Sequence, residues 1–341
     1  MIEREFINQP TERFPRCHCS TIVEIPSGDL LAAWYAGSAE SRPDVAVVTS
    51  RKPKGLPAAT VGAGVKPPHI AQAGAKGWEP FQILSDTPGK PEGNCVLFVA
   101  PDEKLWIFFA VMHGKLDGPP GPGVRWETCD FRCKTSTDEG RTWSETRMLL
   151  EELGMVARCK PIVLKNGDII MGFEHKDGYS YFMISKDMGE TWFWTGPLLG
   201  VKNQHPTLIQ RKDGSILALL RPNDVYRRIG KSISLDNGKT WSPAVNIDLP
   251  NPHAAIDMVK LADGRVVLAF NNNEHHRNPL TLALSENEGE TWQYMRDVVA
   301  EEGAFSYPAI IEDEAGLLHL TYTHNRRHIG HITLPPDWIM E

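Results

Sequence analysis

Residues 136–143 read STDEGRTW, and the same pattern returns as SKDMGETW (185–192), SLDNGKTW (234–241) and SENEGETW (285–292). We call this eight-residue segment the box. The tryptophans that end successive boxes lie about 50 residues apart, and a repeat of roughly 40–50 residues with strand-like patterning is typical of the blades of a β-propeller. The sequence therefore predicts a propeller.

Pairs of apolar segments joined by a short turn surround the boxes. Their β-branched and aromatic residues, interrupted by turn residues, favour strands over helices. Six such pairs occur along the chain, and they predict six blades: STIVEIPSGDLLAAW (20–34), NCVLFVAPDEKLWIFF (94–109), PIVLKNGDIIMGF (161–173), PTLIQRKDGSILALL (206–220), DMVKLADGRVVLAF (257–270) and PAIIEDEAGLLHLTY (308–322).

The two ends of the chain predict how the ring closes. The sixth repeat ends with HIGHITL (328–334), one strand short of a blade, and REFI (4–7) can supply the missing outer strand. This closure leaves no free sheet edge. The first blade keeps only a remnant of the box at Ser50, followed by a Gly/Pro/Ala-rich insertion at 53–76 that we expect to be a mobile loop. The predicted fold class is all-β: a single six-bladed propeller domain over residues 1–341.

The box itself is predicted to be a structural turn without chemistry of its own. Its glycine permits a positive φ, its Ser and Asp side chains can bond to nearby backbone, and its Trp can fill the wedge between neighbouring blades. The fourth box has Asn287 in place of the aspartate. An amide can make the same local bonds, whereas a carboxylate needed for chemistry would not tolerate that change.

Composition narrows the function classes. The 341 residues are 41% hydrophobic and 23% charged, as in an ordinary globular protein, and the net charge of −7 argues against a general nucleic-acid binder. No apolar run is long enough for a membrane span, and the start, MIEREFINQP, has no signal-peptide core. The six cysteines all precede residue 160. We therefore expect a cytoplasmic protein with reduced thiols, no membrane partner and no cofactor.

The functional site is expected at the rim opposite the boxes, where the first strand of each blade begins and the second ends. Propellers commonly build sites at this mouth, on rigid elements. The candidate residues there are His18, Asn94, Lys160, Gln204, His205, Asp257 and Tyr307 from first strands, with Arg42, Asp44, Glu174, Arg221 and Arg277 from the ends of second strands. Arg326 and Arg327 precede the last strand, and we expect at least one of them to be solvated.

Cysteine and histidine residues also gather near this mouth, which raises the question of a metal site. They are Cys17, His18, Cys19, Cys95, Cys159 and His205. Their strands belong to different blades and no C-x-x-C pair occurs, so we expect small buried thiols and no bound metal.

The repeated box resembles the Asp-box of the sialidase (neuraminidase) superfamily, and the resemblance covers essentially the whole chain. TIVEIPSGDLLAAW, PDVAVVTSR, SILALLR, RNPLTLALSENEGETW and SYPAII are also similar to sialidase segments. The resemblance implies that Asp44 is the acid/base, that Arg221 and Arg277 bind the substrate carboxylate, and that Tyr307 is the nucleophile. It also implies hydrolysis of a terminal acidic sugar, such as sialic acid, from a glycan partner.

The chemistry implied by this resemblance has a physical basis. A sialic acid carries its carboxylate on the anomeric carbon, so a neutral tyrosine avoids the repulsion that an anionic nucleophile would meet. Arginines bind such a carboxylate through planar, bidentate pairs. An aspartic acid in a water-poor pocket can protonate the leaving oxygen.

Two positions depart from the sialidase pattern. His18 falls where the family has an arginine, and Gln204-His205 falls where it has the glutamate that activates the tyrosine. Two alternatives therefore stay open. One is β-elimination on a uronate-containing glycan, with histidines and Tyr307 as acid and base while the arginines neutralise the sugar carboxylate. The other is a propeller that binds a glycan without cleaving it.

Overall fold

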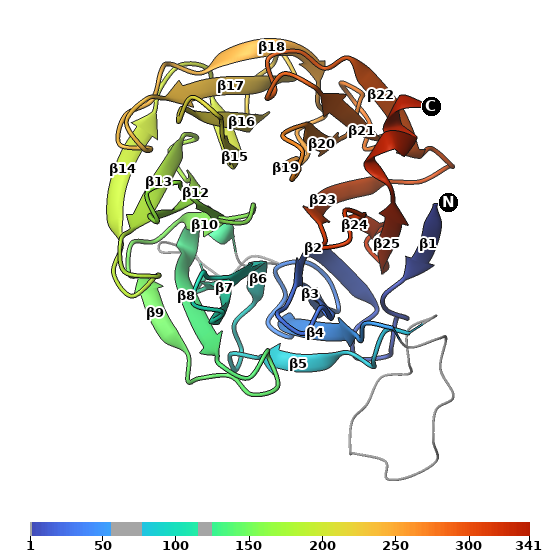
Figure 1. The fold of residues 1–341 in the computed structure, drawn as a ribbon. Coiled ribbons are helices and arrows are strands. Elements are labelled where there is room, and N and C mark those ends of the chain that lie inside the picture. Colours follow the sequence, from blue (N-terminus) through green and yellow to red (C-terminus); the bar gives the residue numbers. More distant parts are fainter. Residues whose placement is uncertain (1, 56–76, 115–124) are drawn as a thin grey trace.

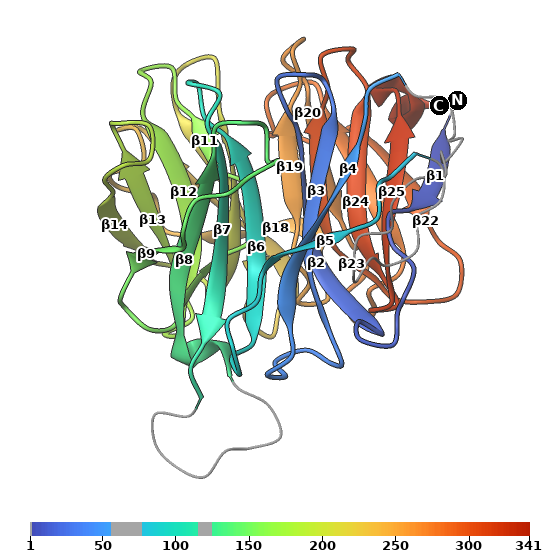
Figure 2. The same cartoon turned by 90° about the horizontal axis from the view of Figure 1, so that it is seen from below.

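A computed structural model describes residues 2–55, 77–114 and 125–341. These residues form six sheets that surround a common axis, as Figure 1 shows. Seen from the side, the strands run between two rims (Figure 2). The chain is thus an all-β, six-bladed propeller, as the sequence predicted. Most of the predicted insertion, residues 56–76, lies outside the described part of the chain.

Each blade is an antiparallel sheet whose first strand lies nearest the axis. Blade 1 contains β2 (Arg16–Glu24), β3 (Leu30–Gly37), β4 (Ala46–Lys52) and β5 (Gln82–Ser85). Blade 2 contains β6 (Glu92–Val99), β7 (Leu105–Met112), β8 (Cys129–Ser136) and β9 (Arg147–Leu150). Blade 3 contains β10 (Met155–Ala157), β11 (Ile162–Val163), β12 (Ile169–His175), β13 (Ser180–Ser185) and β14 (Phe193–Leu198).

The second half of the chain repeats the arrangement. Blade 4 contains β15 (Asn203–Gln210), β16 (Ile216–Pro222), β17 (Arg228–Ser234) and β18 (Val245–Pro250). Blade 5 contains β19 (Asp257–Lys260), β20 (Val266–Phe270), β21 (Leu280–Ser285) and β22 (Tyr294–Val299). Blade 6 contains β23 (Phe305–Glu312), β24 (Leu318–His324), β25 (His328–Leu334) and the N-terminal β1 (Glu3–Phe6).

The N-terminal strand closes the ring, as predicted. β1 pairs antiparallel with β25 from Glu3 opposite Thr333 to Phe6 opposite Gly330, and the two strands lie side by side in Figure 1. The observed strand begins one residue before the predicted REFI segment. Pairing of the two chain ends covers the edge of blade 6 that would otherwise expose unpaired backbone groups.

The core consists of apolar layers between neighbouring blades, and the box tryptophans are part of them. Trp143 packs into the layer between blades 1 and 2, and Trp192 into that between blades 2 and 3. Trp241 stacks on Phe182 between blades 3 and 4, with ring centroids 4.1 Å apart. Trp292 packs into the layer between blades 4 and 5. The predicted wedge role of the tryptophan is confirmed at these four interfaces.

The boxes are tight turns held by their own side chains. In the third box, Ser234 Oγ accepts a bond from the Gly238 N–H at 2.8 Å, and Asp236 accepts from the N–H and hydroxyl of Thr240. The glycine has φ 83°, and Asn237 before it has φ 59°. The residue before the glycine is left-handed in the other boxes as well: Glu139, Met188 and Glu288. The sequence predicted only the glycine of this two-residue turn.

The remaining regular elements are two short 3-10 helices, Trp126–Thr128 and Pro336–Met340. Neither these nor any other helical segment within the described ranges has the length and apolar character that a membrane crossing requires.

Candidate functional site

A repeated backbone irregularity prepares the mouth of the propeller. The first strands of blades 1, 2, 4 and 6 each contain a β-bulge near their start. One non-glycine residue in each bulge has a positive φ: Cys19 (61°), Asn94 (45°), His205 (47°) and Tyr307 (56°). Such backbone persists only where its surroundings enforce it, and bulges redirect side chains next to functional sites. Three of these four residues, all but Cys19, were predicted site residues.

Tyr307 lies at the centre of a group of basic side chains. Its phenolic oxygen accepts a hydrogen bond of 3.3 Å from Nη1 of Arg221. The guanidinium carbons of Arg158 and Arg277 lie 5.4 and 5.5 Å from its ring centroid. Arg158 is fully buried and donates to the carbonyl oxygens of Tyr307 and Pro308, so it also fixes the backbone of the bulge. Positive charge on several sides would stabilise negative charge developing on the phenolic oxygen.

A buried pair stands beside Tyr307. Nε2 of His205 lies 2.9 Å from Oε2 of Glu174, and both side chains are almost completely buried. Nδ1 of His205 lies 3.4 Å from Nη1 of Arg221. Because a guanidinium can only donate, Nδ1 is the acceptor and Nε2 carries the proton that faces Glu174. Burial lowers the pKa of His205, while Glu174 opposes that shift.

Among the described residues at the mouth, His18 has an unpaired polar atom. Its Nδ1 is 2.8 Å from Oγ1 of Thr323, and its buried Nε2 has no hydrogen-bond partner among the described residues. Its ring centroid lies 4.2 Å from that of Tyr307. Burial, followed by the charges of Arg326, Arg277, Arg158 and Arg221, lowers the pKa of His18 well below its ordinary value. The imidazole is therefore neutral, and its free nitrogen is available to a ligand.

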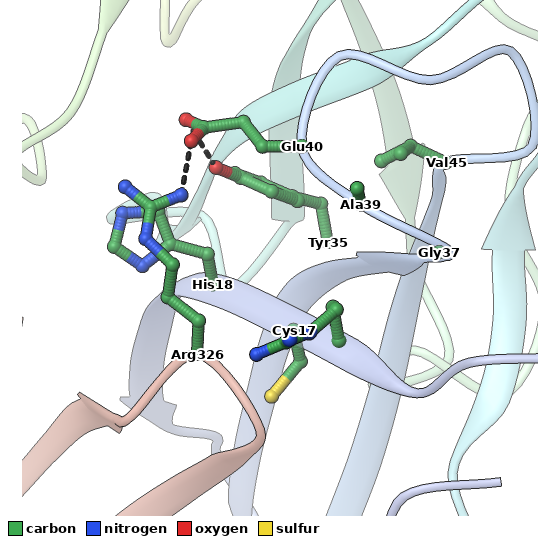
Figure 3. Close-up of a pocket in the computed structure, with 9 residues that line it drawn as sticks. Cys17, His18, Tyr35, Gly37, Ala39, Glu40, Val45 and Arg326 are labelled. Carbon is green, nitrogen blue, oxygen red and sulfur yellow. Dashed lines mark hydrogen bonds and ion pairs between the residues drawn. The ribbon is translucent and has the colours of Figure 1, made fainter.

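A cavity of about 410 Å³ opens beside His18, and Figure 3 shows the side chains around it. Glu40 reaches into this cavity, where it accepts a 2.9 Å hydrogen bond from the Tyr35 hydroxyl and forms an ion pair with Arg326. The lining residues are Arg16, Cys17, His18, Tyr35, Gly37, Ala39, Glu40, Val45 and Arg326. His18 and Arg326 line this cavity, and His18 also lies beside Tyr307 and its arginines.

Three arginines from different blades thus face the mouth. Arg221 ends β16, Arg277 follows β20, and Arg326 lies in the turn between β24 and β25. Burial lowers the pKa of Arg277; Tyr307 opposes that shift, and Arg221 and Arg326 add to it by repulsion. Several close guanidinium groups make a site that favours an anion. The sequence left open which of Arg326 and Arg327 is solvated, and only the hairpin geometry brings Arg326 to the cavity.

The loop between β3 and β4 carries both predicted residues Arg42 and Asp44, and both are exposed. Asp44 accepts hydrogen bonds from the Ser38 N–H and hydroxyl, each 2.8 Å long. Neither Arg42 nor Asp44 lines the cavity; Glu40 of the same loop does. Glu40 was not among the predicted site residues, because adjacent loop residues cannot be ranked without knowing which way each points.

Lys160 and Asp257 have a different arrangement from the one expected. Nζ of Lys160 lies 2.7 Å from Oδ2 of Asp257, which also accepts from the Ile310 N–H, while Thr207 donates to Oδ1. These contacts tie blades 3, 4, 5 and 6 together along the inner strands. Because both carboxylate oxygens are occupied, their contacts indicate a structural link, and they do not favour the predicted role in substrate binding.

The other two predicted binding residues lie on inner strands at the mouth. Oδ1 of Asn94 is 3.6 Å from the Cys19 thiol. Gln204 is buried and faces Arg221 across the β15–β16 pair. All six cysteines fall in the described part of the chain and are free and buried. Within that part, no group of three or more His, Cys, Asp or Glu side chains is placed to hold a metal ion.

Comparison of the sequence with known families and proteins gives two matches. The model of a family described as BNR repeat-like domain matches residues 28–320. The chain is 22% identical over 285 residues to a sialidase of Bacteroides fragilis (strain YCH46), covering 72% of this chain and 52% of that protein. The chain therefore spans about half the length of this curated relative.

Solved structures show the same fold. A protein of unknown function from Dyadobacter fermentans superposes with a TM-score of 0.78 at 17% identity, covering 97% of this chain and 98% of that one. The K499G mutant of the NanB sialidase from Streptococcus pneumoniae gives a TM-score of 0.77 at 14% identity, covering 98% of this chain and 70% of that one. At these identities the likeness concerns the fold alone.

Proposed function

Because the chain belongs to the BNR repeat-like domain family, whose model matches most of its length, we propose that it is a sialidase-like glycoside hydrolase. Its substrate is a glycan that ends in an acidic sugar, sialic acid or a related one. The observation that carries this proposal is the 3.3 Å contact between Nη1 of Arg221 and the phenolic oxygen of Tyr307, with Arg277 over the same ring. This contact supports a role for Tyr307 as a nucleophile beside a group of arginines that binds an anion.

The arginines first bind the substrate carboxylate. Arg221, Arg277 and Arg326 approach from three blades, so together they can fix an acidic sugar in one orientation. The ion pair with Glu40 holds the guanidinium of Arg326 at the cavity. A planar guanidinium gives each contact a direction that an ammonium group does not provide.

Tyr307 then attacks the anomeric carbon. A bond forms between the phenolic oxygen and that carbon, the phenolic proton passes to Nδ1 of His205, whose Nε2–H faces Glu174, and the bond to the leaving glycan oxygen breaks. Arg221 stabilises the charge on the phenolic oxygen, and the buried pair of His205 and Glu174 holds Arg221 from the other side. By resemblance, we assign protonation of the leaving oxygen to Asp44, which Ser38 holds on the exposed loop that borders the cavity. Water then gives a proton to Asp44 and forms a bond to the anomeric carbon, while the bond to Tyr307 breaks and the phenolic oxygen recovers its proton from His205.

One observation favours a second candidate, β-elimination on a uronate-containing glycan. The groups beside Tyr307 are imidazoles, and Nε2 of His18, which has no hydrogen-bond partner among the described residues, is free to exchange a proton with a substrate. The same arginines would neutralise the carboxylate next to the carbon that loses its proton. The two reactions use one site and differ in their products.

A substrate panel tests the proposal. Sialyl oligosaccharides, glucuronate-terminated and rhamnose–glucuronate oligosaccharides are incubated with the protein, and products are separated by chromatography while ultraviolet absorbance is recorded. We expect release of a saturated acidic monosaccharide. An unsaturated product that absorbs in the ultraviolet would establish elimination instead, and binding without any turnover across the panel would contradict catalysis.

A further inference from the structure

A second cavity lies on the outer part of blade 3, away from the cavity of Figure 3. It has a volume of about 290 Å³, near the lower end of small-ligand pockets. We call it the blade-3 groove, and its lining residues are Glu152, Met155, His175, Tyr181, Trp194, Thr195 and Gly196. We propose that this groove is a binding site for a neutral sugar.

Aromatic side chains give the groove an apolar surface of the kind that a sugar ring covers. Trp194 on β14 is 40% exposed although it is the largest type of apolar side chain. Its ring packs edge-on against Phe173, with centroids 5.6 Å apart, so its position is fixed by the core beneath it. Tyr181 on β13 lies in the same groove. A rigid aromatic surface matches the C–H face of a pyranose, which is the apolar side of an otherwise polar molecule.

A polar group with an unmet hydrogen bond stands beside this surface. Nδ1 of His175 lies 3.1 Å from Oδ2 of Asp177, and the same oxygen accepts a 2.8 Å bond from the Tyr181 hydroxyl. These contacts fix the imidazole, but its buried Nε2 has no hydrogen-bond partner among the described residues. An unpaired buried nitrogen is costly, and a sugar hydroxyl can satisfy it.

The charge of the groove selects against an anion. Glu152 lines it, and its Oε1 lies 3.6 Å from Nε2 of His175, with Asp177 behind the ring. Among the described residues that line the groove, none is a lysine or an arginine. A carboxylate or sulfate on the ligand would meet Glu152 without a compensating cation. The ligand class is therefore a neutral, hydroxyl-rich sugar, the opposite of what the arginine-lined mouth attracts.

The groove is joined to the mouth through a single strand. Glu174 and His175 are successive residues at the end of β12, so their side chains point to opposite faces of the sheet. Glu174 contacts His205 beside Tyr307, whereas His175 lines the groove. This closeness suggests that the neutral sugar belongs to the same glycan whose acidic end binds at the mouth. That second step rests on the proposed function; binding of a neutral sugar in the groove does not.

Direct titration tests the inference without any turnover. Lactose, cellobiose, maltose and N-acetylglucosamine are titrated into the full protein, followed by saturation-transfer NMR and calorimetry, and then into the Trp194→Ala variant. The neighbouring Phe193→Ala is the matched control, because Phe193 is exposed on the same strand and does not line the groove. We expect at least one sugar to bind, with Kd rising about three- to tenfold for Trp194→Ala, the loss of one aromatic contact, and staying unchanged for Phe193→Ala.

A second variant keeps the test independent of folding. Glu152 is exposed at the edge of the groove, so Glu152→Gln leaves the core intact while it removes the negative charge; Glu151→Gln is its control. Galacturonate, which the groove of the wild type should reject, is added in competition with the bound neutral sugar, and it is expected to displace that sugar from Glu152→Gln at a concentration at least about threefold lower than from Glu151→Gln. Absence of neutral-sugar binding, or equal binding by Trp194→Ala and Phe193→Ala, would overturn the inference. A protein that cleaves acidic glycosides but binds no neutral sugar would remove this inference alone.

Discussion

The two rims of this propeller are built on opposite plans. At the box rim, four segments of one sequence pattern make the same local bonds. In the first box and in the fourth, the serine accepts from the glycine N–H, and the threonine donates to the aspartate or to Asn287. At the mouth, blades 1, 2, 4 and 6 share a backbone feature, the bulge with a left-handed residue, but each places a different side chain on it: Cys19, Asn94, His205 and Tyr307. One rim repeats a solution to folding. The other uses one repeated backbone to present residues that occur only once.

The difference teaches where a substitution should act. The recurring Ser and Asp side chains of a box, with Asn287 in the fourth, have equivalents in other blades and bond within their own turn, so their loss should affect stability locally and leave binding unchanged. A mouth residue has no equivalent, because the site needs contributions from several blades at once. The following predictions test this contrast, beginning with the largest effect.

Tyr307→Phe should separate activity from stability most sharply. Removal of the phenolic oxygen leaves Arg221 without its partner and deletes the nucleophile, so kcat/KM on an acidic glycoside should fall by about 10³-fold or more. The melting temperature should change little. Tyr294→Phe, on the outer strand β22 at the box rim, is the control and should retain full activity. A Tyr307→Phe enzyme with even a tenth of wild-type activity, roughly, would end its assignment as nucleophile.

The ring closure and the boxes should lose stability in different pH ranges. Burial lowers the pKa of His331 from 6.5 to about 4, against the opposing effect of Glu5. Unfolding returns this pKa to its ordinary value, so the unfolded chain binds more protons between these limits and stability falls as the pH drops from 6.5 to about 4. For a full shift the loss approaches about 3 kcal/mol. His331 joins β25 to β1, so this is a property of the ring closure.

A box carboxylate should respond only at lower pH. Bonds from the hydroxyl and N–H of Thr142 and the Ser136 hydroxyl lower the pKa of Asp138 from 3.8 to about 2. Its contribution is therefore complete above 3.8 and disappears as the pH falls towards 2. Urea unfolding at a series of pH values should show that His331→Gln flattens the dependence between pH 6.5 and 4 and that Asp138→Asn does not. Identical profiles for both variants would refute the separation.

Arg277→Lys and Arg265→Lys compare the two rims within one blade, since these arginines flank the two ends of β20. A lysine cannot reproduce a bidentate contact, so Arg277→Lys should lower kcat/KM for an acidic substrate by about 10- to 100-fold, mainly through KM. Arg265 pairs with Asp263 and Asp337 at the opposite rim. Steady-state kinetics should show no effect of Arg265→Lys; equal effects of the two changes would remove Arg277 from the substrate site.

The smallest effect is expected in the boxes themselves. Asp236→Ala removes the acceptor of three local hydrogen bonds and should lower the free energy of unfolding by about 1 kcal/mol without changing KM. In the fourth box, Asn287 already bonds to the N–H and hydroxyl of Thr291, so Asn287→Asp should stay within about 0.5 kcal/mol. Urea titration measures both. A large loss of activity in Asp236→Ala with normal stability would show that the box contributes to the site.

The sequence located much of the mouth but not its contacts. Tyr307, Arg221, His205 and His18 were predicted from strand position and resemblance, and the structure brings these four together. The His205–Glu174 pair was not predicted as a pair, because the two residues come from different blades. Nor could the pattern show that Asp257 is fully occupied by Lys160, Thr207 and Ile310, since those partners lie 97, 50 and 53 positions away in the chain.

By itself, the sequence determined the ring: its six blades, the turns of one rim and the strand that closes it. Those features depend on local bonds and on a period that recurs along the chain. The repetition of a stretch such as STDEGRTW is therefore enough to predict the ring. Only the tertiary structure decided which polar residues meet at the other rim. His18 bonds to Thr323, 305 positions away, and Arg326 reaches the cavity from the last hairpin. Such contacts follow from the direction of each bulged side chain and from which side chains of different blades meet at the axis, neither of which a local pattern records.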